Sequence, residues 1–168
     1  MMDTAVLENA SVERQRDFWQ RLSDVRAGML GLDVAHRMVP MTHYCDKGDS
    51  TLWFIGADGS EIVESVKGGP RAAHYVLTSM SEGIYANLIG ELSLENNSMK
   101  LDELWNAVAD SWFEGGRRDP NVQLLRFRLV EGEIWSTTTS SLSFAYEIAK
   151  SKVTDEKPDV GENYVLKF

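Results

Sequence analysis

Short turns, rather than helices, separate most of the strand-like runs in this chain. Residues 37–44 lead through a turn cluster into the strongly β-prone run 51–55, and a turn at 131–132 is expected between the runs 124–130 and 133–136. Antiparallel strands can be joined by a tight turn, whereas parallel strands need a crossover of a dozen or more residues. The pattern therefore excludes a doubly wound parallel sheet. It predicts a mainly β fold, a small antiparallel barrel of six or seven strands with helices packed outside.

Two residues interrupt the predicted strands and indicate what lies beside them. Pro40 falls inside the run 37–44 and cannot donate a backbone hydrogen bond, so this strand is expected at an edge, or bulged where something other than a strand approaches. The same run is expected to form a hairpin with residues 51–55. Gly90 interrupts the alternating run 85–94, which predicts a bend or a close neighbour at that position.

Helical periodicity appears at both ends of the chain and between the strands. Apolar residues recur at helical spacing, and residues such as Ser60 are suitable N-caps. The expected helices are residues 12–25, 60–67, 100–113 and 142–152. No internal repeat or low-complexity tract divides the chain. Residues 1–153 are therefore predicted to form one domain, followed by a C-terminal tail over 154–168 whose polar first half is flexible.

Charge and cysteine content exclude several classes of function. The 168 residues include 17 Lys and Arg against 26 Asp and Glu, a net charge of −9 that would repel a phosphate backbone, so no nucleic-acid partner is expected. A single cysteine allows no intrachain disulfide, and the scattered histidines offer no metal-ligand spacing, so no metal site is expected. The N-terminus resembles no secretion signal, and no segment approaches the ~18 apolar residues of a membrane helix. The chain is expected to be soluble and cytoplasmic.

Common catalytic motifs are missing, but aromatic residues are abundant. The sequence has no G-x-S-x-G elbow, no P-loop and no G-x-G-x-x-G after a strand. It has five tryptophans, of which most are expected in the core. An apolar, aromatic-lined cleft would nevertheless suit a flat heteroaromatic ligand.

The order of several short motifs resembles a known family. The motifs are residues 28–32 (GMLGL), 40–42 (PMT), 51–54 (TLWF), 103–105 (ELW), 112–116 (WFEGG), 119–120 (DP), 124–127 (LLRF) and 133–135 (EIW). Together they resemble the general stress protein 26 group of the pyridoxamine 5′-phosphate oxidase-like, FMN-binding split-barrel superfamily. The resemblance runs from about residue 13 to residue 135, and residues 144–150 and 158–161 resemble a bacterial subgroup.

The resemblance implies a fold, a cofactor and a set of site residues. The fold would be a homodimer of six-stranded antiparallel Greek-key split barrels with peripheral helices, holding FMN in clefts at the interface. The isoalloxazine would lie along the strand that contains Pro40, with the phosphate near a helix start, where free N–H groups suit an anion. Tryptophans from the same chain or the partner subunit would close the cleft. The implied cofactor-binding residues are Arg37, Pro40, Met41, Thr42, Trp53, Phe54, Ser60, Glu61, Trp112 and Trp135.

One residue departs from the family pattern. The family usually has a phosphate-binding lysine directly after the position of Ser60, and this chain has Glu61. A carboxylate there weakens FMN binding unless Arg37 or Arg71 compensates. Three functions remain open: a flavin-dependent oxidoreductase using FMN, FAD or another flavin, with a nicotinamide as candidate electron donor; a non-catalytic flavin-binding or sequestering module; and a split barrel that has lost flavin and acts in protein interaction. No catalytic acid or base is identified.

Overall fold

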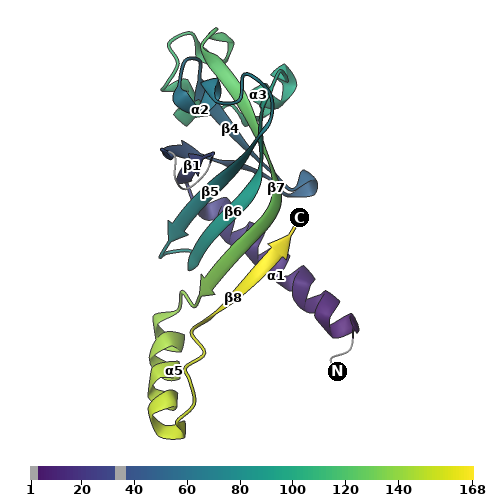
Figure 1. The fold of residues 1–168 in the computed structure, drawn as a ribbon. Coiled ribbons are helices and arrows are strands. Elements are labelled where there is room, and N and C mark those ends of the chain that lie inside the picture. The colour runs from purple at the N-terminus through teal and green to yellow at the C-terminus, as the bar shows by residue number, and fades with distance from the viewer. Residues whose placement is uncertain (1–3, 33–36) are drawn as a thin grey trace.

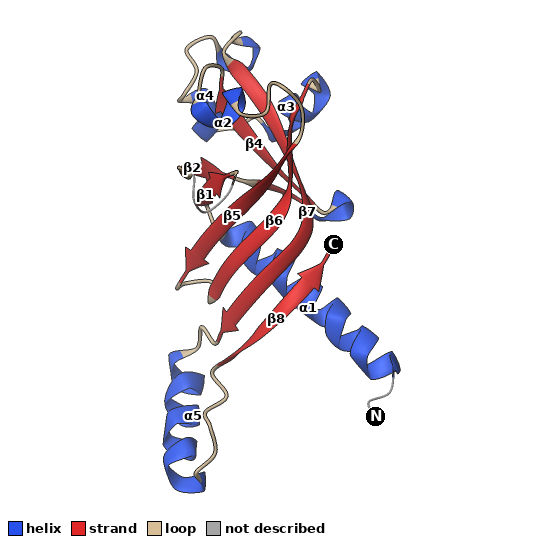
Figure 2. Cartoon of the chain, viewed as in Figure 1, coloured by secondary structure: helices blue, strands red, loops and turns tan. Residues whose placement is uncertain are grey.

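One antiparallel sheet of eight strands, with helices outside it, makes up the fold (Figure 2). The structure is a computed structural model, and it describes residues 4–32 and 37–168. The strands are β1 (Ala27–Gly31), β2 (Val39–Thr42), β3 (Tyr44–Asp46), β4 (Thr51–Ala57), β5 (Arg71–Ser79), β6 (Ile84–Glu95), β7 (Val122–Thr137) and β8 (Gly161–Lys167). The α-helices are α1 (Thr4–Asp24), α2 (Glu61–Glu64), α3 (Ser98–Leu104), α4 (Ala107–Asp110) and α5 (Ser141–Thr154), and short 3₁₀ turns cover Lys47–Asp49 and Gly116–Arg118.

The chain connectivity makes the sheet curl. Its strand order is β2-β1-β5-β6-β7-β4-β3, with β8 also paired to β7, and every pairing is antiparallel. The two edge strands, β2 and β3, are consecutive in sequence and are separated only by His43. Opposite edges of a seven-strand path can lie one residue apart only if the sheet rolls up, which confirms the predicted split-barrel architecture. The number of strands described is eight rather than six.

The proline-containing strand is at an edge, as predicted, but its partner differs. Pro40 in β2 lies opposite Met29 of β1, and β2 has no second strand partner in the described residues. The predicted hairpin between residues 37–44 and 51–55 is therefore wrong for most of its length. Only the short β3 pairs with β4, where Tyr44 lies opposite Trp53.

Two long strands carry the barrel. β7 runs without interruption through Gly132, so the turn predicted at 131–132 does not form. Its continuity follows from its partners: β6 pairs along one edge, while β4 and then β8 occupy the other. The register of β6 against β7 shifts between Ile89 and Gly90, where a Cβ on Gly90 would meet the Arg128 backbone. This bulge confirms the close neighbour expected at Gly90.

The C-terminal residues are not a free tail. Residues 161–167 form β8 on the edge of β7, and Tyr164 and Leu166 are buried. The ring of Phe168 packs 5.5 Å from that of Phe18 and 5.9 Å from that of Trp19, both in α1. Sequence periodicity missed this strand because its apolar residues acquire their partners only when α1 and β7 are in place.

The helix predicted over 100–113 is two short helices. Trp105 adopts an extended conformation, and the Asn106 side chain caps α4 by accepting hydrogen bonds from the backbone N–H groups of Val108 and Ala109. An asparagine side chain that hydrogen-bonds nearby backbone N–H groups favours the start of a helix over its interior. The apolar residues at helical spacing in this segment are consequently not all core residues.

Helix α1 covers the inner side of the rolled sheet, whereas α5 stands clear of it (Figure 1). Phe18 and Leu22 of α1 are fully buried. The Arg21 guanidinium donates to the carbonyls of Glu82, Gly83 and Thr137, which fixes the helix to the end of β7. The helix begins at Thr4, earlier than the residue 12 expected from its capping pattern.

The remainder of the core consists of large apolar residues from the strands. It includes Leu30, Phe54, Tyr75, Leu88, Phe127 and Ile134, all fully buried. Within the described ranges, no helix has both the length and the apolar content needed to cross a membrane.

Candidate functional site

A largely apolar cavity of about 360 Å³ opens beside the edge strand β2. Figure 2 shows α2 and α4 together at the same end of the sheet, near the end of β4. Side chains and backbone from these elements enclose the cavity. Its lining residues are Val39, Pro40, Met41, Thr42, Tyr44, Ile55, Gly56, Ala57, Ser60, Glu61, Ile62, Val108, Ala109, Trp112 and Phe113.

The inner wall is β2, and a buried hydrogen-bond chain holds it in place. The carbonyl oxygen of Met41 lies 2.9 Å from the Tyr75 hydroxyl, and that hydroxyl is 2.8 Å from Nδ1 of His43. Nε2 of His43 lies 3.0 Å from the carbonyl oxygen of Leu22, which can only accept, so Nε2 carries the proton. In the neutral ring Nδ1 is then an acceptor, and it competes with the Met41 carbonyl for the single proton of the Tyr75 hydroxyl. The chain ties the last turn of α1 to the strand that faces the cavity.

Burial shifts the pKa values along this chain. Desolvation lowers the pKa of His43, although its hydrogen bond to the Leu22 backbone opposes the shift. Burial also raises the pKa of Tyr75. Both effects favour the neutral forms, so the wall behind Met41 carries no charge near neutral pH.

The polar end of the cavity is the turn between β4 and α2. The Ser60 Oγ atom is shielded from solvent and has no hydrogen-bond partner among the described residues. Glu61 is the only charged residue among those that line the cavity in the described part of the chain. Its carboxylate is 3.9 Å from Nη1 of Arg37, and both side chains are more than half exposed. Exposed ion pairs of this kind contribute little to stability.

The outer wall is α4 and the residues that follow it. Asn106 holds α4 through its Oδ1 atom, which lies 3.1 and 3.0 Å from the N atoms of Val108 and Ala109 and 3.5 Å from the Tyr44 hydroxyl. Burial raises the pKa of Tyr44, so this hydroxyl stays protonated near neutral pH. Val108 is 54% exposed and Trp112 is 79% exposed. The outer wall therefore presents uncovered apolar surface beside the cavity mouth.

Most of the predicted site residues meet at this cavity. Six of them line it directly: Pro40, Met41, Thr42, Ser60, Glu61 and Trp112. Arg37 lies just outside, in a smaller adjoining cavity of about 130 Å³ that it shares with Glu61. Val108 and Phe113 were not among the predicted site residues, and both line the cavity because α4 is a separate helix.

Three predicted residues lie elsewhere. Phe54 is fully buried and its ring centroid is 5.1 Å from that of Tyr75, so it belongs to the core. Trp53 points to the other face of β4, where the Lys100 ammonium lies 5.6 Å from its ring. Trp135 is on the outer face of β7, opposite Tyr85, and is 40% exposed. None of the three lines the cavity within this chain.

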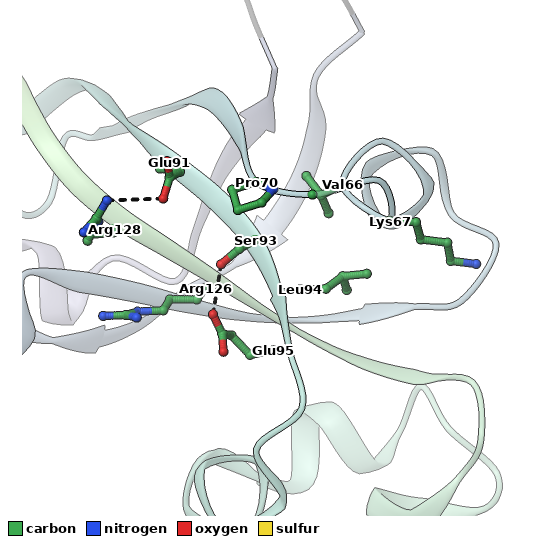
Figure 3. Close-up of a pocket in the computed structure, with 10 residues that line it drawn as sticks. Val66, Lys67, Pro70, Glu91, Ser93, Leu94, Glu95, Arg126 and Arg128 are labelled. Atoms are coloured by element: carbon green, nitrogen blue, oxygen red, sulfur yellow. Dashed lines mark hydrogen bonds and ion pairs between the residues drawn. The ribbon is translucent and has the colours of Figure 1, made fainter.

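A second cavity, of about 370 Å³, is polar and lies on the outer side of β6 and β7 (Figure 3). Its cations already have partners: Arg128 Nη2 is 3.2 Å from Glu91 Oε1, and Arg126 Nη2 is 2.6 Å from Asp49 Oδ2. Figure 3 also shows the Lys67 ammonium directed away from these residues. That ammonium pairs with Asp58 and Glu64, outside the cavity. Nε of Arg126 has no hydrogen-bond partner among the described residues. Because each cation of this cavity is already paired with a carboxylate, the cavity at β2 is the stronger candidate site.

Comparison with known proteins places the fold and the site in context. A crystal structure named as general stress protein 26 from Jannaschia sp. CCS1 is 43% identical, with a TM-score of 0.87 over 94% of this chain and 99% of that one. The general stress FMN/FAD binding protein from Xanthomonas citri is 30% identical, with a TM-score of 0.69 over 77% of this chain and 92% of that one. A general stress family protein from Xanthomonas campestris is 27% identical, with a TM-score of 0.68 over 83% and 93%.

A family model also matches most of the chain. No curated protein matches the chain. The model described as pyridoxamine 5′-phosphate oxidase like matches residues 13–159, which include every element from most of α1 to the end of α5. The rolled antiparallel sheet, the edge strand beside the cavity and these similarities agree. The chain belongs to the pyridoxamine 5′-phosphate oxidase-like family.

Proposed function

We propose that this protein binds a flavin, with its ring in the cavity between β2 and α4. The observation that carries the proposal is the cavity itself, an apolar slot bounded by an edge strand and by an exposed tryptophan. The name of the Xanthomonas citri relative, which describes FMN/FAD binding, supports the same ligand class. Flat heteroaromatic ligands favour apolar walls with a few polar groups that fix their orientation.

The residues present fit the ring and the polyol part of a flavin. Val108 and Trp112 offer apolar surface to the ring, and an edge strand such as β2 leaves backbone groups unpaired that can hydrogen-bond its polar edge. The solitary Ser60 hydroxyl suits a polyol hydroxyl. A bound flavin would supply hydride or electron transfer, and the protein would supply orientation and exclusion of water.

A second copy of the chain would complete the cavity. The outer wall is uncovered, and a separate apolar surface on the outer face of the sheet is also exposed, with Met29, Tyr85, Trp135 and Val165 each at least 36% exposed. We infer a homodimer in which this surface, with Trp135, covers the cavity of the partner. That arrangement would remove both apolar surfaces from water, which is the usual reason for such surfaces.

A flavin titration tests the proposal. Purified protein is titrated with FMN and riboflavin while flavin fluorescence and visible absorbance are followed, and the variants Trp112→Ala and Tyr146→Ala are compared. Both residues are exposed aromatics, but Tyr146 is on α5, away from the cavity. We expect saturable binding near one flavin per chain, weakened about tenfold by Trp112→Ala and unchanged by Tyr146→Ala. The proposal would be refuted if neither flavin binds, or if the two substitutions weaken binding equally.

Two functions follow from flavin binding, and one experiment separates them. Among the described lining residues only Glu61 and Tyr44 are titratable, which favours a flavin-binding or sequestering module over an enzyme that needs a general acid or base. Anaerobic addition of NADH or NADPH to the flavin-loaded protein distinguishes them. Bleaching of the flavin absorbance would indicate a nicotinamide-dependent oxidoreductase, and an unchanged spectrum would indicate the binding module.

A further inference from the structure

The charge distribution of the cavity bears on the tail of the ligand rather than on its ring. Apolar residues occupy the α4 side, whereas the polar residues Ser60 and Glu61 are together at the start of α2. A flavin has an apolar ring and a polar tail, so matching polarity directs the tail toward α2. The chemistry of these two residues then decides which tail is accepted.

Glu61 disfavours an anionic tail. A phosphate monoester carries close to two negative charges near pH 7, and charges a few ångströms apart at a protein surface repel appreciably. Within the described part of the chain, no Lys or Arg is among the residues that line the cavity. Arg37 is near, but it already faces the Glu61 carboxylate at 3.9 Å, and its side chain is 80% exposed. The pair offers a phosphate no net positive charge.

The same residues favour an uncharged polyol. A carboxylate accepts hydrogen bonds from hydroxyl groups, and these charge-assisted bonds are stronger than neutral ones. The Ser60 hydroxyl is shielded and has no partner in residues 4–32 and 37–168, so a ligand hydroxyl there would satisfy it. A ribityl chain ending in a free hydroxyl would meet both groups without repulsion.

We propose that Glu61 is a specificity-determining residue that makes this cavity select riboflavin, with its uncharged tail, over the phosphate-bearing FMN. The inference rests on the proposed flavin binding. It differs from that proposal because it concerns the relative affinity of two flavins and not whether a flavin binds.

The test compares the affinities of the two flavins for charge variants of two exposed positions, Glu61 and Arg37. Dissociation constants for riboflavin and FMN are measured by flavin fluorescence for the wild type, Glu61→Gln, Glu61→Lys and Arg37→Gln. Glu61 and Arg37 are 65% and 80% exposed, so these variants should fold as the wild type does. Circular dichroism of each variant verifies this.

Each outcome has a definite meaning. We expect the wild type to bind riboflavin about tenfold more tightly than FMN, Glu61→Gln to remove most of the difference, and Glu61→Lys to reverse it. Arg37→Gln should weaken FMN binding by severalfold and leave riboflavin unchanged. Equal or tighter binding of FMN by the wild type would overturn the specificity proposal and leave flavin binding intact. Equal shifts for both flavins in the Glu61 variants would do the same. If neither riboflavin nor FMN binds the wild type or any variant, flavin binding itself is refuted.

Discussion

Replacing Tyr75 by Phe removes one hydroxyl from the buried chain that holds the cavity wall. The hydroxyl lies 2.9 Å from the Met41 carbonyl oxygen and 2.8 Å from Nδ1 of His43, and Tyr75 is fully buried. Its ring packs edge-to-face on Phe54 at 5.1 Å, and a phenylalanine ring would keep that contact. The substitution therefore isolates the contribution of the hydroxyl.

The expected cost follows from the unpaired groups that remain. An unsatisfied buried acceptor costs about 1–3 kcal/mol, whereas an average hydrogen bond contributes only about 1 kcal/mol net. The Tyr75 hydroxyl has one proton for two acceptors, so one acceptor loses its donor when the hydroxyl is removed. We expect a loss of about 2 kcal/mol in the free energy of unfolding, which corresponds to a decrease of about 4–8 °C in Tm for a chain of this size.

Urea unfolding followed by tryptophan fluorescence measures this loss. The matched control is Tyr146→Phe, because Tyr146 is exposed on α5, away from the cavity, and should change stability by less than about 0.5 kcal/mol. Riboflavin affinity provides a second readout, since Met41 lines the cavity. We expect Tyr75→Phe, but not Tyr146→Phe, to weaken binding severalfold.

Two results would contradict this reasoning. Equal free energies of unfolding for Tyr75→Phe and the wild type would show that the hydroxyl does not satisfy a buried group. A destabilised variant with unchanged riboflavin affinity would show that the chain supports the core but does not position β2 against the ligand.

Two further predictions concern stability. Burial lowers the pKa of His43 in the native state, so below about pH 6.5 the unfolded chain binds more protons than the native one. The free energy of unfolding therefore decreases as the pH is lowered, with a slope of up to about 1.4 kcal/mol per pH unit. In urea titrations between pH 7.5 and 5, His43→Gln should show a smaller decrease than the wild type; equal slopes would exclude His43 as the source. A chain ending at residue 160 lacks β8 with the buried Tyr164 and Leu166 and should lose about 3–6 kcal/mol, measured by thermal unfolding. The control Lys167→Gln, at an exposed position of β8, should change Tm little. Equal Tm values for the shortened and full chains would show that β8 does not stabilise the barrel.

Local sequence signals predicted the features that depend on backbone chemistry. Pro40 lacks an N–H group, so its strand could occur only at an edge or bulge, and β2 is an edge strand. Gly90 marked a close approach, and β6 has its register shift there. Short turns predicted antiparallel pairing, which holds throughout the sheet. These predictions succeeded because the forbidden hydrogen bond or the missing side chain acts at the residue itself.

Other features required the tertiary structure. The apolar spacing of residues 100–113 fits one helix, but the Asn106 cap and packing near Tyr44 divide it in two and place Val108 at the cavity. Glycine at position 132 suggested a turn, yet partners on both edges keep β7 extended. A local pattern cannot register a partner strand that lies 30 residues or more away in sequence.

The division between sequence and structure is sharpest at the candidate site. Six of its ten predicted residues line the cavity, because the motif 40–42 lies in β2, residues 60–61 are at the start of α2, and the motif 112–116 follows α4. The sequence by itself also placed Glu61 where a lysine was expected. The positions of Phe54 in the core and of Trp135 outside the cavity depend on how the sheet rolls, which is known only from the tertiary structure. The physical reason is that neighbouring side chains of a strand point to opposite faces, and the closure of the sheet determines which face becomes the interior.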